Sequence, residues 1–445
     1  MHPIASVVPL FLIFGGLPAA ACSPETCTST MSPRDLGEFL KQATAKPRTQ
    51  SRSQPKTVEV RTPNGAWHAW LDSPGGKLPF GLRFRMSKGV LAASVHNGPE
   101  RIPIPVVDFN AGKLTLGFDY YDSRLTAKLD KAGKRFDGQW IKRRGGKKVV
   151  TMQFHAVSGR QSRFPVLGSR EVVPFVDDRW RVQFEKDKHP AVGVFKRVGE
   201  SIIQGTFLTT LGDYRYLAGT QDGRLVRLSC FDGAHAFLFE ARLGTDMRLE
   251  GDFWSSNTWH ERWSAKRDEN ASLPDAWKLT TADTSHLGRL RFPDLEGRPR
   301  ALSDSAFAGK ARILVVFGSW CPNCKDETAY LVELDRRYRK RGLSIVGLAF
   351  EHSGDAKRDM QQLKTYAKRQ DIRFPLLLAG LSDKAKASQV LPLLDRVRSY
   401  PTTLFLHEDG RLHSVHTGFS GPGTGPEYTK LRERFDSIIE ELLKS

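Results

Sequence analysis

The sequence predicts two fold classes in one chain: an N-terminal all-β region and a C-terminal α/β sandwich. Residues 57–267 contain short runs rich in Val, Phe, Leu, Trp and Tyr, separated by turns with glycine, and show no useful helical periodicity. Residues 283–445 instead alternate apolar strand-like runs with amphipathic helical segments. A length of 445 residues exceeds one ordinary domain, so we expect several folded units.

The N-terminus has the pattern of a secretory signal peptide over residues 1–21. It is apolar from Ile4 onward and ends in three alanines, although it has no Lys or Arg before the apolar stretch. Cleavage there would make Cys22 the first residue of the mature chain. Cys22 is then either a lipid attachment site, because residues 19–22 resemble a bacterial lipobox, or the partner of Cys27 in a small disulfide. Residues 22–56 are polar and basic, which predicts a linker with at most one short helix.

The charge balance is strongly basic, with a formal net charge of +19. In a cytosolic protein this charge would suggest nucleic acid as a partner. For an exported chain we expect no nucleic acid and a solvated basic surface that can lie against anionic membrane headgroups. The densest basic run, residues 142–148, has Gly145-Gly146 at its centre and predicts a charged hairpin tip.

The β region has an internal repeat, which predicts two related units at residues 57–157 and 179–267 joined by a connector at 158–178. Four short markers recur in the same order at nearly equal spacing. Phe118-Asp119, Ala127-Lys128-Leu129, Gly138-Gln139-Trp140 and Phe154-His155-Ala156 correspond to Phe231-Asp232, Ala241-Arg242-Leu243, Gly251-Asp252-Phe253 and Trp263-Ser264-Ala265. We therefore expect an antiparallel barrel or sandwich built by duplication.

Most tryptophans of the chain lie in this β region, and two interpretations of them stay open. They either pack in the core and on the sheet faces or line a pocket for an apolar or sugar ligand. The set is Trp67, Trp70, Trp140, Trp180, Trp254, Trp259 and Trp263. Cys230, alone in an apolar run, is predicted to be a buried small hydrophobic residue.

A second linker is predicted at residues 268–282, and the α/β domain follows at residues 283–445. Its expected strands are residues 313–317, 343–350, 374–378, 402–406 and 412–415, and its expected helices are residues 325–341, 355–370, 383–391 and 426–443. Alternating strands and helices followed by a hairpin and a closing helix predict a sandwich with a mixed sheet.

Cys321 and Cys324 stand three residues apart between the strand at 313–317 and the helix that follows. At a helix N-terminus, unpaired backbone amides and the helix dipole favour a thiolate at Cys321. Cys324 would lie one turn further on and less exposed, as a resolving thiol. A C-x-x-C pair also suits zinc, but a structural zinc site needs a second pair of ligands that the sequence does not supply. We therefore expect no metal and no cofactor other than a redox-active disulfide.

The C-terminal region resembles the TlpA-like branch of the thioredoxin superfamily, and in particular the ResA type of thiol–disulfide oxidoreductase. The resemblance covers residues 283–445, about the last third of the chain, and implies a thioredoxin-like fold. It rests on Phe292-Pro293-Asp294-Leu295-Glu296-Gly297, Leu302-Ser303, Gly309-Lys310, residues 317–324, Tyr400-Pro401-Thr402-Thr403 and Gly418-Phe419-Ser420-Gly421.

The resemblance also implies the roles of single residues. Cys321 would attack a substrate disulfide, and Cys324 would resolve the mixed disulfide. Glu327 would manage their protons, although a solvated first-turn carboxylate is the alternative for this residue. A cis-proline is expected at Pro401, and the residues expected to contact substrate are Trp320, Pro322, Tyr400 and Pro401.

The function expected from the whole sequence is that of an exported thiol–disulfide oxidoreductase in the periplasm or cell envelope. It would reduce disulfides of protein substrates and receive electrons from a membrane donor, although the sequence leaves the direction of electron transfer open. One alternative is a ligand- or partner-binding β protein with an accessory redox module. Another is a peroxiredoxin-like peroxidase, which would need Thr or Ser where Gly318 stands.

Overall fold

The computed structural model describes residues 62–145, 148–168, 171 and 173–444. The predicted signal peptide, the linker at 22–56 and both Cys22 and Cys27 lie outside these residues. No helix in the described part of the chain combines the length and the apolar character that crossing a membrane requires.

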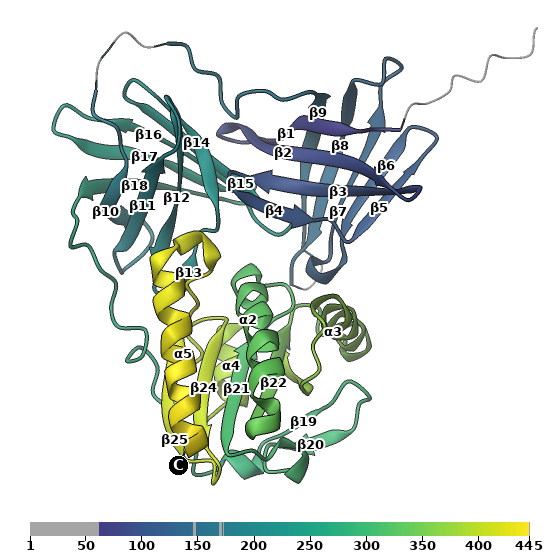
Figure 1. Ribbon diagram of the computed structural model, residues 1–445, viewed down its shortest axis with the longest axis vertical. Helices are drawn as coiled ribbons and strands as arrows, with labels where there is room; N and C mark the ends of the chain where they lie inside the picture. The colour runs from purple at the N-terminus through teal and green to yellow at the C-terminus, as the bar shows by residue number, and fades with distance from the viewer. Residues whose placement is uncertain (1–61, 146–147, 169–170, 172, 445) are drawn as a thin grey trace, which may run out of the picture. The chain divides into compact units, whose positions relative to one another are not determined.

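The first β sheet is an open half-barrel of nine antiparallel strands (Figure 1). Its strands lie side by side in the order β4-β3-β2-β1-β9-β8-β7-β6-β5. Their bounds are β1 Gly65–Ser73, β2 Gly76–Ser87, β3 Val90–Asn97, β4 Glu100–Pro103, β5 Val106–Asn110, β6 Lys113–Phe118, β7 Ser123–Leu129, β8 Arg135–Arg143 and β9 Val149–Ser158. A short 3₁₀ turn, η1 Asp119–Tyr121, joins β6 to β7.

The second sheet closes into an eight-stranded barrel, because β12 pairs with both β11 and β14. Closure leaves no free edge along these strands. The bounds are β10 Asp178–Phe184, β11 Ala191–Arg197, β12 Ile202–Thr209, β14 Leu217–Asp222, β15 Leu225–Phe231, β16 Ala236–Leu243, β17 Arg248–Ser255 and β18 Trp259–Arg267. The two-residue strand β13 Gly212–Asp213 lies beside the end of β12.

The two sheets share one strand order, which supports the predicted duplication. Counting from β1 and from β10, equivalent strands occupy equivalent places in both sheets. The repeated markers also share a register. Ala127 pairs with Gly138 and Gly138 with Phe154, while Ala241 pairs with Gly251 and Gly251 with Trp263. The expected antiparallel all-β region is confirmed, with an open first sheet and a closed second sheet.

Five of the seven tryptophans are buried, as the core interpretation expects: Trp67, Trp70, Trp140, Trp180 and Trp263. One of them, Trp140, also lines a cavity. Trp259 is exposed instead, and Trp254 is half-buried. Cys230 is fully buried, as predicted. Within the basic run at 142–148, Lys142 and Arg143 belong to β8, and residues 146 and 147 lie outside the described part of the chain. Lys142 is not a solvated tip residue, because its ammonium donates a hydrogen bond to the Ala234 carbonyl.

The C-terminal domain has a thioredoxin-like fold with a five-stranded mixed sheet ordered β23-β22-β21-β24-β25. Its strands are β21 Ala311–Phe317, β22 Leu343–Glu351, β23 Leu376–Leu381, β24 Thr402–His407 and β25 Leu412–Thr417, preceded by the hairpin β19 Arg291–Pro293 and β20 Pro299–Ala301. The helices are α2 Pro322–Tyr338, α3 Ala356–Gln370, α4 Lys384–Val390 and α5 Pro426–Lys444. The central strand β21 is buried along its whole length, as its unbroken apolar run predicts.

Candidate functional site

Cys321 and Cys324 lie where β21 passes into α2. Cys321 is the N-cap of α2, and its Sγ accepts a hydrogen bond from the Cys324 backbone N–H at 3.2 Å. Both cysteines are free thiols. Cys321 is 6% exposed and Cys324 is fully buried, so Cys321 is the one an incoming group can reach. This order of exposure agrees with the order expected from the sequence.

The residues expected to contact substrate gather around Cys321. The Tyr400–Pro401 peptide bond is cis, and the Tyr400 carbonyl oxygen lies 3.4 Å from Cys321 Sγ. The Trp320 ring stacks on His352 at a centroid distance of 4.2 Å and meets the Tyr400 ring edge-on. Trp320, Cys321, Pro322 and Tyr400 line one cavity.

Glu327 lies one turn after Cys324 on α2 and is fully buried. One carboxyl oxygen accepts a 2.6 Å hydrogen bond from the Thr403 hydroxyl, and the other has no hydrogen-bond partner. Burial raises the pKa of Glu327 to about 8. Burial is also the largest of the effects that hold the pKa of Cys324 well above its usual range, with smaller contributions from Cys321 and Glu327. The alternative of a solvated first-turn carboxylate is therefore wrong, because α2 turns this side chain toward β24.

A second buried carboxyl group, Glu351, lies at the end of β22 and was not predicted from the sequence. Its two oxygens accept hydrogen bonds from the backbone N–H and the hydroxyl of Ser319, both at 2.8 Å. Burial raises its pKa to about 8 as well. The group holds the turn that leads into the cysteine pair, and its contacts are to Ser319 rather than to either thiol.

The barrel contributes a short segment, residues 211–213, which we call the cover. It contacts the first turn of α2 and two loops of the redox site. The Leu211 carbonyl accepts a 2.8 Å hydrogen bond from the Ser399 hydroxyl, next to Tyr400. The Asp213 carbonyl accepts one from the Asn323 amide at 3.4 Å, and the Asp213 carboxylate accepts one from the Gly421 backbone at 2.6 Å. A Cβ on Gly212 would lie 1.8 Å from the Asn323 amide nitrogen, so glycine permits this close approach.

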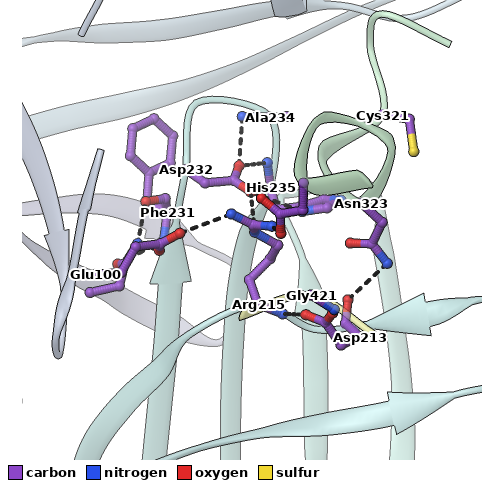
Figure 2. A network of polar contacts seen from close by, with 12 residues as sticks. Glu100, Asp213, Arg215, Phe231, Asp232, Ala234, His235, Cys321, Asn323 and Gly421 are labelled. Atoms are coloured by element: carbon purple, nitrogen blue, oxygen red, sulfur yellow. Dashed lines mark hydrogen bonds and ion pairs between the residues drawn. The ribbon is translucent and has the colours of Figure 1, made fainter. Parts of the chain in front are cut away.

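A buried arginine, Arg215, joins the cover to both β sheets and to α2. Its guanidinium lies 2.8 Å from Glu100 and 3.5 Å from Asp232, and it is paired with Asp326 on α2. Figure 2 shows Arg215 between these groups of the β sheets, with Asp213 turned toward Asn323 and Gly421. Three carboxylates around one cation, mostly removed from water, fix the position of this segment.

The cavity at Cys321 has a volume of about 440 Å³ and is walled by both regions of the chain. Trp140, Lys142 and the cover line it from the β region, and Lys384 lines it from α4. Burial lowers the pKa of Lys142 to about 8. A volume of this order accommodates a small molecule or a short stretch of polypeptide.

Comparison with known proteins adds evidence about the C-terminal region, beside the cysteine pair, the cis peptide bond and the strand order. The AhpC/TSA family model matches residues 286–415. This segment is similar to proteins of that family. It is similar to thiol–disulfide oxidoreductase ResA of Bacillus thuringiensis subsp. konkukian (strain 97-27), with 31% identity over 119 residues that cover 27% of this chain and 60% of the relative.

ResA of Geobacillus thermodenitrificans (strain NG80-2) is 30% identical to the AhpC/TSA domain region over 125 residues, which cover 28% of this chain and 63% of that protein. The chain therefore spans less than two thirds of the length of these relatives. Among solved structures, a thiol:disulfide interchange protein of the thioredoxin family from Chlorobium tepidum TLS matches with 22% identity and a TM-score of 0.27, covering 39% of this chain and 99% of that chain. The assignment of the fold rests on the strand order and the family match.

Several site residues could not be identified from the sequence. The cover and Arg215 are more than one hundred residues from the cysteines, and no local pattern connects them. Thr403, which pairs with Glu327, lies within the Tyr400-Pro401-Thr402-Thr403 motif, and this motif was the signal in the sequence for its place at the site. For Glu351, the only signal in the sequence was its place at the end of an apolar strand.

Proposed function

We propose that the chain is an exported thiol–disulfide oxidoreductase that reduces disulfides of protein substrates through Cys321 and Cys324. The observation that carries the proposal is the placement of Cys321. Its sulfur accepts the Cys324 amide at the start of α2, lies beside the Tyr400 carbonyl and has the buried Cys324 thiol directly behind it. The names of the ResA relatives agree with this chemistry.

In the first step, the Cys321 thiolate attacks one sulfur of the substrate disulfide and releases the other sulfur as a thiolate. The N-terminus of α2 stabilises the attacking thiolate through the Cys324 amide. The Tyr400 backbone and the side chains of Trp320, Pro322 and Pro401 orient the substrate next to Cys321.

In the second step, Cys324 attacks the sulfur of Cys321, closes the protein disulfide and releases the substrate's second thiolate. Cys324 must lose a proton first, and its burial opposes this loss. Glu327 accepts that proton when ionised, and Thr403 holds the carboxyl group in place. With the pKa of Glu327 at about 8, its ionised fraction rises roughly tenfold per pH unit below pH 8.

The oxidised chain returns to the dithiol by taking electrons from a membrane donor, and it works in the periplasm or cell envelope. This part of the proposal is supported by the signal-peptide pattern at residues 1–21. Lipid attachment at Cys22 would anchor the protein. The alternative of an independent β-region binding protein is disfavoured, because the cover contacts the loops that surround Cys321.

Trapping tests the proposal directly. A Cys324→Ala variant should accumulate mixed disulfides at Cys321, because the resolving thiol is missing, whereas Cys321→Ser should accumulate none. Cys230→Ala is the matched control and should behave as the wild type, since Cys230 is buried in the barrel. Absence of any adduct in Cys324→Ala, detected by non-reducing electrophoresis and peptide mapping, would contradict the proposal.

A further inference from the structure

A second cleft, of about 700 Å³, adjoins the cavity at Cys321. The two share Leu211 of the cover and Lys384 of α4 as wall residues. Lys278 and Arg396 also line this cleft. The two hollows adjoin at these shared residues; we call them together the groove, and we call the part that does not contain Cys321 the basic cleft.

The basic cleft is lined by four cationic side chains and by no carboxylate: Lys278, Lys384, Arg396 and Arg398. Lys278 pairs with Asp275 at 3.8 Å and Arg398 pairs with Asp395 at 2.6 Å, while Lys384 and Arg396 make no ion pair within the described residues. Two carboxylates, Asp187 and Asp213, line the cavity at Cys321. The Asp213 carboxylate accepts a hydrogen bond from the Gly421 backbone N–H. Asp275, Asp395 and, in the neighbouring cavity, Asp187 compensate part of this charge, and the cleft keeps an excess of positive charge to which Arg396 contributes without an ion pair. Excess charge of one sign on a concave surface focuses the potential.

The cover restricts what can approach Cys321. It is hydrogen-bonded to Ser399, Asn323 and Gly421, and Cys321 keeps only 6% of its surface exposed. A folded partner docks through a broad patch, on the order of 800 Å² on each side. Such a patch cannot reach Cys321 while the cover is in place, whereas a single extended strand can lie in the groove.

We propose that the groove binds the substrate as an extended, acidic polypeptide segment, with its disulfide at Cys321 and its carboxylates against Lys278, Lys384 and Arg396. This inference rests on the proposed function and specifies its substrate class. The electrons balance within the two steps. The segment's disulfide gains two electrons and becomes two thiols, and Cys321 and Cys324 lose two electrons and become one disulfide.

The test uses three synthetic peptides of equal length, each with one disulfide between two cysteines flanked by Glu, Gln or Lys. Pre-reduced full-length protein is mixed with each peptide, and oxidation of Cys321 and Cys324 is followed by alkylation quench in a single turnover. The Glu peptide should react about tenfold faster than the Gln peptide, and the Lys peptide should be slowest. The advantage of the Glu peptide should shrink as salt is raised.

Two variants localise the effect to the basic cleft. The double variant Lys278→Gln/Arg396→Gln should slow the Glu peptide about tenfold and leave the Gln peptide unchanged, because both side chains are exposed and remote from the reacting sulfurs. Lys113→Gln, an exposed lysine on β6, is the matched control and should change neither rate. A folded acidic protein with a native disulfide should react about 100-fold more slowly than the Glu peptide, since three hydrogen bonds of the cover must open.

Equal rates for the three peptides would overturn the inference, as would equal slowing of the Glu and Gln peptides by the double variant. A folded protein that reacts as fast as the Glu peptide would also overturn it. Binding to phosphatidylglycerol vesicles that the double variant loses, without discrimination among peptides, would identify a membrane surface as the partner instead. Failure of the proposed function has a different signature: neither a peptide nor glutathione disulfide would then oxidise Cys321 and Cys324.

Discussion

Replacing Glu327 by glutamine tests the role of the buried carboxyl group most sharply. Glutamine keeps the size of the side chain and an oxygen that accepts the Thr403 hydroxyl bond, but it cannot take a proton from Cys324. The attack by Cys321 should therefore keep its rate, while the resolving step should slow. In the wild type the resolving rate should rise with pH and level off near pH 8, following the pKa of Glu327. In Glu327→Gln this rise should be absent.

The size of the accompanying stability effect follows from the same pKa. The carboxyl group ionises at about 8 in the folded protein, against an ordinary value of 4.5. Between these two pH values the folded state holds a proton that the unfolded chain has lost, so stability falls as pH rises through this window. At about 1.4 kcal/mol per pH unit, the ionised buried carboxylate costs about 5 kcal/mol above pH 8. Glu327→Gln should therefore gain about 5 kcal/mol relative to the wild type between pH 4.5 and pH 9.

The assay combines chemical denaturation across this pH range with rapid-quench measurement of the resolving step. Glu351→Gln is the matched control, because Glu351 has a similarly raised pKa but bonds to Ser319. It should show a comparable change of stability with pH and keep the pH dependence of resolution. If Glu327→Gln retained the wild-type rise in the resolving rate, the assignment of Glu327 as proton acceptor would be refuted.

The remaining predictions concern the cover, the Arg215 cluster and the reaction type. Gly212→Val should displace the cover, because the Cβ of valine would overlap the Asn323 amide. The variant should lower the free energy of unfolding by about 1 to 3 kcal/mol and should speed alkylation of Cys321. Unchanged alkylation would show that the cover does not restrict access. Arg215→Met should lower the free energy of unfolding, measured with denaturant, by about 3 to 5 kcal/mol, since it leaves buried carboxylates without their cation. Arg411→Met is the control: 73% of the Arg411 side chain is exposed, so stability should change by less than about 0.5 kcal/mol. Hydrogen peroxide should oxidise Cys321 no faster than an ordinary free cysteine, because Gly318 stands where a peroxidase would need a hydroxyl group. Rapid turnover of peroxide in a competition assay would favour the peroxidase alternative.

The thioredoxin-like domain could be predicted closely because its signals are local. The apolar run before Cys321, the helical spacing after it and Gly342 determine a strand, a helix and its end within a few dozen residues. The predicted helix at 325–341 starts at Pro322 in the structure, because Cys321 itself caps it. The repeated markers likewise predicted two related β units.

What the sequence could not predict depends on pairing between distant segments. Closure of the second sheet requires β12 to pair with both β11 and β14. Nothing in the sequence indicates that the equivalent strands of the first sheet, β3 and β5, do not pair. The cover reaches Asn323 from 110 residues away, and Glu327 is buried because α2 packs against Thr403 on β24. Such contacts arise from tertiary packing, which periodicity and spacing do not encode.

The central claim, that Cys321 and Cys324 exchange a disulfide, is tested most directly by equilibrating the full-length protein in glutathione buffers of stepped potential. Alkylation followed by peptide mapping then reports the state of each cysteine. We expect one two-electron transition in which Cys321 and Cys324 lose their labels together while Cys230, buried in the barrel, does not change. Independent behaviour of the two cysteines, or no transition at any potential, would contradict it.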